Sequence, residues 1–144
     1  MYQRILVPTD GSDVTAKAVQ TAIGLAKLSG GQLVTISAKE PFPYSAISEM
    51  QPVPPQEFYD AQERIAAARV KSVQDAATEA GLTCQAHTVE ALHAWEAIID
   101  HAKQQRCDLI VMASHGRRGM AALLLGSETQ RVLIHSPLPV LIVK

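Results

Sequence analysis

The sequence predicts an α/β fold: one open, five-stranded parallel sheet with helices on both faces. Short apolar runs with β-branched residues alternate along the chain with longer segments of helical periodicity. A helix between two such runs forms a right-handed crossover, which makes the two strands parallel. The 144 residues fit one domain, 1–144, with enough chain to bury a substantial core.

The first half of the chain predicts a strand, a helix and a second strand. The apolar run at 4–8 is followed by the turn Asp10-Gly11, and Ser12 or Asp13 is expected to cap a helix. Gly30 is expected to end that helix in a left-handed conformation. A second strand follows at 33–38.

The segment at about 40–56 is predicted to be a long loop. It has no periodicity and contains Pro41, Pro43, Pro52, Pro54 and Pro55. Its length exceeds that of ordinary connections, so a lid, a partner-binding segment and a tolerated surface insertion all remain open.

The second half predicts three more helices and three more strands. A long helix is expected to end at Gly81, followed by a weak edge strand at 82–89. The remaining elements are a strand at 109–113, a short helix that opens at Gly126-Ser127, and a last strand at 140–143. The stripes of the three helices are Tyr59, Ala66, Val70, Val73, Ala77 and Ala80; then Leu92, Trp95, Ile98, Ile99 and Ala102; then Thr129, Val132 and Leu133.

Composition argues against several partner classes. The formal net charge of −1 gives no electrostatic footprint for nucleic acid or for membrane surfaces. The chain opens without a signal-peptide pattern and has no apolar run of membrane-spanning length. The two cysteines, Cys84 and Cys107, are expected to be reduced. We therefore expect a cytoplasmic protein.

The stretch from Asp108 to Ser127 predicts a phosphate-binding loop. Gly116 and Gly119 allow close backbone approaches, and Arg117 and Arg118 supply paired cationic side chains. Gly126-Ser127 then places a hydroxyl and unpaired amides at a positive helix N-terminus.

The spacing of this loop resembles the nucleotide-binding signature of the universal stress protein family, which is Gly, two residues, Gly, nine residues, Gly, then Ser or Thr. Here Gly116, Gly126 and Ser127 match the last three positions, and Ala113 replaces the first glycine. The opening Ile-Leu-Val-Pro-Thr-Asp-Gly-Ser and the closing Pro-Leu-Pro-Val-Leu-Ile-Val are also similar to the family. The resemblance implies strand order 3-2-1-4-5 with a crevice beside strands 1 and 4.

The resemblance implies an adenine nucleotide, ATP or else AMP or cyclic AMP, with Mg²⁺ able to arrive on it. Asp10 is expected to bind the ribose or the adenine edge, its alternative being an Asx-turn or cap residue. His115 is expected to donate to phosphate or backbone, since no nucleophile or acidic partner supports it as a general base. The full set of expected binding residues is Pro8, Thr9, Asp10, Ser37, Ala38, Met112, Ala113, His115, Gly116, Arg117, Gly126, Ser127 and Thr129.

The resemblance also implies a stress-response sensor or signalling protein that forms a homodimer through the last strand, Val140 to Val143. An apolar edge strand independently needs covering. Catalytic turnover beyond slow ATP hydrolysis is not expected, and the histidines show no metal-ligand spacing. The main alternative is a family member that has lost nucleotide binding and acts only as a protein-interaction dimer.

Overall fold

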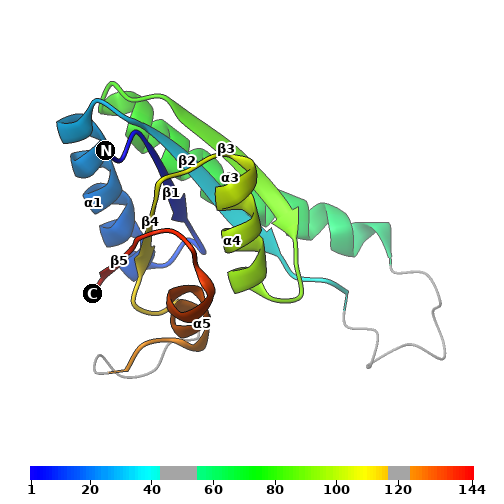
Figure 1. Cartoon of the computed structure of the whole chain (residues 1–144). Coiled ribbons are helices and arrows are strands. Elements are labelled where there is room, and N and C mark those ends of the chain that lie inside the picture. The colour runs from blue at the N-terminus through cyan, green and yellow to red at the C-terminus, as the bar shows by residue number, and fades with distance from the viewer. Residues whose placement is uncertain (43–54, 117–123) are drawn as a thin grey trace.

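A computed structural model describes residues 1–42, 55–116 and 124–144. Figure 1 shows helices on both sides of a central sheet. In chain order the elements are β1 (Arg4–Pro8), α1 (Asp13–Ser29), β2 (Gln32–Lys39), α3 (Gln56–Glu79), β3 (Cys84–Glu90), α4 (Ala94–Gln104), β4 (Leu109–Ala113), α5 (Ser127–His135) and β5 (Val140–Val143).

The five strands form one parallel sheet in the order β3-β2-β1-β4-β5. The predicted fold class and strand order are therefore confirmed, including the edge position of β3. β1 pairs with β2 from Arg4↔Gln32 to Pro8↔Ile36, and its other side pairs with β4 at Ile5↔Leu109. The carboxyl ends of the two central strands consequently lie at one edge of the sheet.

Two apolar layers hold the helices on the sheet. α1 and α3 cover one face, where Ile5, Val7 and Leu33 are fully buried. α4 and α5 cover the other face, where Leu6 and Val34 are fully buried. Adjacent strand residues enter opposite layers because side chains alternate along a strand. This explains why the strands of a parallel sheet are continuously apolar.

Helix ends follow the predicted capping chemistry in α1. Ser12 is the N-cap and accepts a hydrogen bond from the amide of Thr15, and Gly30 ends the helix with φ 71°. At the end of α4, however, Arg106 has a left-handed backbone with φ 55°. No glycine marks that position, so the sequence carried no signal for it.

Two predicted stripe residues are wrong. Leu92 is 77% exposed because α4 begins at Ala94, two residues later, so Leu92 lies outside the helical register. Leu133 is 39% exposed on α5, whose buried side is Thr129 and Val132. Trp95 is half-buried rather than enclosed in the core.

The predicted proline-rich loop lies largely outside the described residues, which omit 43–54. Phe42, just before the omitted residues, packs edge-to-face on Phe58 of α3 with ring centroids 5.1 Å apart. Within the described ranges, none of the helices combines the length and the apolar character that crossing a bilayer requires.

Candidate functional site

The turn after β1 fixes the carboxylate of Asp10. Its Oδ1 accepts hydrogen bonds from the Ser12 amide at 2.9 Å and from the Thr15 hydroxyl at 2.7 Å. These bonds are charge-assisted and set the orientation of the whole carboxylate. Asp10 therefore acts as an Asx-turn residue, and the same bonds determine where Oδ2 lies.

The loop after β4 meets that carboxylate at Gly116. A Cβ built on Gly116 would lie 2.6 Å from Oδ2 of Asp10, closer than a real side chain can approach. Any other residue at 116 would force the Asp10 carboxylate to move, so glycine is favoured here by the close approach and not by a positive φ, which Gly116 does not have. Two segments far apart in the sequence thus touch at the carboxyl edge of the sheet, where open α/β sheets bind ligands.

The start of α5 is fastened to the end of β4. The Gly126 amide donates to the carbonyl of Ser114 at 2.8 Å, and a Cβ on Gly126 would come within 3.2 Å of the His115 Cα. The Thr129 hydroxyl donates to the carbonyl of Ala113 at 3.0 Å. Ser127, the first residue of α5, stays exposed. The N-terminus of α5 therefore opens toward the same edge as Gly116.

Ala113, which replaces the first signature glycine, occupies an ordinary strand position. It is the last residue of β4, is absent from the residues with positive φ, and is 7% exposed in the layer under α1. Its neighbour Met112 is 6% exposed in the opposite layer. The backbone conformation and the packing at position 113 therefore accept alanine as well as glycine.

The ends of β1 and β2 line the other side of the same edge. Pro8 ends β1 opposite Ile36, and the Thr9 amide donates to the Ile36 carbonyl at 2.9 Å. Ser37 is 1% exposed, and its hydroxyl has no hydrogen-bond partner among the described residues. Ala38 is half-buried beside it.

The structure thus gathers Pro8, Thr9, Asp10, Ser37, Ala38, Met112, Ala113, His115, Gly116, Gly126, Ser127 and Thr129 on β1, β2, β4, the loops after them and the start of α5. Arg117 lies outside the described residues. A contact of any of these residues with a ligand stays a prediction.

Three residues that hold or cover the candidate site were not predicted from the sequence. Thr15 orients Asp10 through its hydroxyl. Ser114 links β4 to α5 through its carbonyl, and its hydroxyl oxygen lies 3.1 Å from Nδ1 of His115. Arg69 of α3 lies over Gly11, because a Cβ there would meet its Cγ at 3.2 Å. The Thr15 signal was local, a hydroxyl in the first turn of a helix after Asp10. Nothing in the sequence links Arg69 to Gly11.

An ion pair fastens α3 to the same end of the sheet. Lys39 at the end of β2 lies 2.7 Å from Glu63 of α3, and the Thr88 hydroxyl of β3 also donates to Glu63. The hydrogen bond from Lys39, followed by that from Thr88, holds the pKa of Glu63 below 4.5. Glu63 is exposed, so the pair positions α3 without contributing much stability.

Two cavities of about 300 and 310 Å³ lie along α4, and neither is lined by residues of β1 or β4. The first is lined by residues from Val89 to Gln104, and the second by Trp95, Ile99 and His135 with polar neighbours. Neither contains an expected nucleotide-binding residue. Among the residues that the structure describes, no group of three His, Cys, Asp or Glu side chains could hold a metal ion.

The whole chain is similar to known proteins of one family. The model of the universal stress protein family matches residues 1–144. Universal stress protein MJ0531 of Methanocaldococcus jannaschii is 32% identical, and the match covers all of this chain and 83% of that protein.

Two solved structures are similar in both fold and sequence. Hypothetical protein MJ0577 of the same organism has a TM-score of 0.85 and 25% identity, over 100% of this chain and 96% of the other. A universal stress protein solved in complex with cAMP has a TM-score of 0.73 and 30% identity, over 99% of this chain and 97% of the other. With its strand order and the full-length family match, this chain belongs to the universal stress protein family.

Proposed function

We propose that this chain binds an adenine nucleotide at the carboxyl edge of β1 and β4 and acts as a stress-response sensor or signalling dimer in the cytoplasm. The contact between Asp10 and Gly116 carries the proposal, because it brings the two motif-bearing loops into one place. A relative with 30% identity has been solved with cAMP, which supports an adenine nucleotide as the ligand class. ATP, AMP and cAMP are the candidates.

The chemistry at this edge fits an anion beside a nucleoside. The first-turn amides of α5 have no intrahelical partners, and the helix dipole makes that end positive, so phosphate is favoured near Gly126 and Ser127. Arg117 is proposed to neutralise phosphate. The buried hydroxyl of Ser37, which has no hydrogen-bond partner among the described residues, offers a hydrogen bond near the proposed base and ribose. Mg²⁺ is proposed to arrive on the nucleotide, since the described residues offer no metal cluster.

The direct test is nucleotide binding by the purified protein. Denatured protein should release adenine absorbance, and ATP with Mg²⁺, AMP and cAMP should be titrated while the melting temperature is followed. A ligand at about one hundred times its dissociation constant stabilises by roughly 2.7 kcal/mol. GTP is the matched control for the base, and adenosine for the phosphates. The proposal would be rejected if the denatured protein released no adenine and no adenine nucleotide shifted the melting temperature.

The second candidate is a dimer that works without nucleotide. Ala113 favours it, because a ligand atom that packs against the signature glycine of the family would meet a methyl group here, although the fold itself accepts alanine at this position. Both candidates share a homodimer through β5, whose outer edge lies at the end of the sheet. Light scattering measures the mass in solution, and the nucleotide titration separates the two candidates.

A further inference from the structure

The first turn of α5 contacts the first turn of α4 through one short hydrogen bond. Oε2 of Glu128 accepts from the backbone amide of Trp95 at 2.7 Å. Trp95 is the second residue of α4, so its amide has no carbonyl partner within the helix. The N-cap His93 supplies no side-chain hydrogen bond. Glu128 therefore caps α4 from a different helix.

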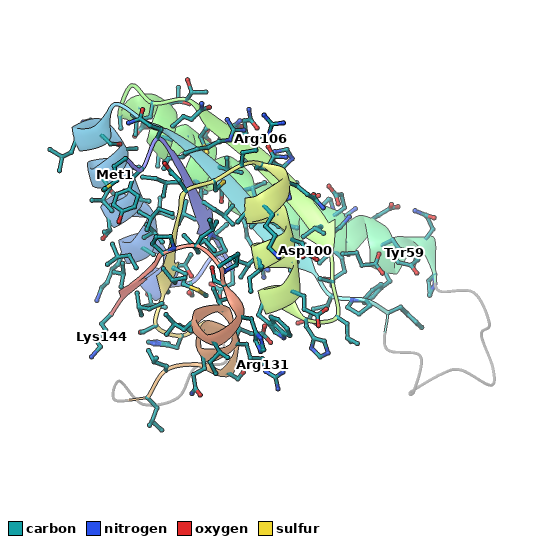
Figure 2. The ribbon with its side chains drawn as sticks, viewed as in Figure 1. Met1, Tyr59, Asp100, Arg106, Arg131 and Lys144 are labelled. Carbon is teal, nitrogen blue, oxygen red and sulfur yellow. The ribbon has the colours of Figure 1, made fainter. Side chains whose placement is uncertain are left out.

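The same tryptophan holds the far end of α5. The ring of His135 stacks on the Trp95 ring with centroids 4.7 Å apart and an interplanar angle of 26°. The Arg131 guanidinium lies 6.0 Å from the centre of that ring. Residues 128, 131 and 135 share one face of α5 by helical spacing. Figure 2 shows Arg131 on α5, beside α4 with Asp100. Trp95 thus contacts α5 in both its first and its last turn.

Glu128 would oppose a phosphate if its side chain were not held away. It follows Gly126 and Ser127, so its charge belongs to the turn whose amides are proposed to bind phosphate. The bond to Trp95 places that charge at the positive end of α4 instead. The carboxylate consequently stabilises one helix N-terminus and leaves the other available for an anion.

We infer that Glu128 is a positioning residue. Its hydrogen bond to the Trp95 amide holds Gly126 and Ser127 in position and couples the nucleotide site to Trp95. This inference rests on the proposed function, since it assigns a role within that site. It also predicts a signal. Trp95 is the single tryptophan of the chain, so its fluorescence should change when nucleotide binds at the start of α5.

Three substitutions at Glu128 separate the hydrogen bond from the charge. Glu128→Gln keeps an acceptor oxygen and removes the charge, so ATP should bind at least as tightly as to wild type. Glu128→Ala removes both, and its dissociation constant should be about fivefold or more above that of Glu128→Gln, about 1 kcal/mol. Glu128→Asp keeps the charge on a side chain one methylene too short to reach Trp95, and should bind most weakly. Glu96→Ala, an exposed first-turn residue of α4, is the control and should behave as wild type.

Isothermal titration with ATP and Mg²⁺, together with Trp95 fluorescence, gives the answer. ATP should change the fluorescence of wild type and Glu128→Gln, and the change should be lost in Glu128→Ala. Circular dichroism verifies folding, and Glu128→Asp replaces Glu128→Ala if the alanine variant does not fold. Equal affinity of the Gln and Ala variants would overturn the inference while the proposed function stands. Absence of adenine-nucleotide binding by wild type would overturn both.

Discussion

Gly116→Ala tests the contact on which the site depends. The new methyl group would lie 2.6 Å from Oδ2 of Asp10, where an ordinary contact needs about 3.4 Å. Asp10 can give way only by rotating, and its other oxygen is bound by Ser12 and Thr15 at 2.9 and 2.7 Å. Loss of one hydrogen bond to a charged group costs about 1.5–3 kcal/mol. We therefore expect the free energy of unfolding to fall by about that amount.

Urea denaturation and thermal melting measure this loss. For a chain of this length, 1 kcal/mol corresponds to roughly 3 °C, so the melting temperature should fall by about 5–9 °C. Gly24→Ala is the matched control. A Cβ on Gly24, inside α1, would meet nothing within 4 Å, so alanine there should stabilise by about 0.5–1 kcal/mol.

A double-mutant cycle with Asp10→Ala identifies the cause. Without the carboxylate, the methyl group of Gly116→Ala has no oxygen to displace, and the substitution should then cost less than about 0.5 kcal/mol. The same cost in both backgrounds would show that Asp10 is not what limits position 116. A cost near zero in wild type would refute the close approach itself.

Other substitutions test the backbone, the titrating side chains and the edge strand. Arg106→Gly should raise the free energy of unfolding by about 1 kcal/mol, because φ is 55° there. A lower free energy of unfolding, measured by urea denaturation, would contradict this. Burial, and then a neighbouring histidine, lower the pKa of His101 below 6.5. The native protein therefore binds fewer protons than the unfolded chain, so its stability should fall as the pH drops from 6.5 toward the native pKa. In thermal melts at acidic pH, His101→Gln should make stability depend less steeply on pH. Burial raises the pKa of the Cys84 and Cys107 thiols to about 11, so stability should fall as the pH rises from 9.0 toward 11, and a thiol reagent at pH 8 should label the protein only after unfolding. Leu141→Lys should convert the proposed dimer to a monomer in light scattering, and an unchanged mass would reject β5 as the interface.

Most of the fold could be predicted from the sequence because its signals are local. β1, β4 and β5 begin and end where their apolar runs do, and Ser12 and Gly30 bound α1 as their capping chemistry requires. One prediction failed where a helix start lacked such a signal. α4 begins at Ala94 with no side-chain cap of its own, so the stripe was extended back to Leu92.

The elements of the candidate site were predicted in the same way, from the residues that follow β1 and β4. Their arrangement was not. Gly116 was predicted to allow a close backbone approach, but only the structure shows that the group lying against it is the Asp10 carboxylate. Likewise, a first-turn acid is locally an ordinary helix residue, and only the packing of α5 on α4 gives Glu128 the Trp95 amide as its partner.

By itself, then, the sequence determined the strands, the helices, the parallel sheet and the family, because periodicity, caps and motif spacing act within a few residues. Tertiary structure alone decided which distant residues meet: Asp10 with Gly116, Arg69 with Gly11, and Glu128 with the amide of Trp95. The reason is physical. Such contacts depend on how helices pack across the sheet, and a difference of a few tenths of an ångström decides whether a methyl group fits or a hydrogen bond forms.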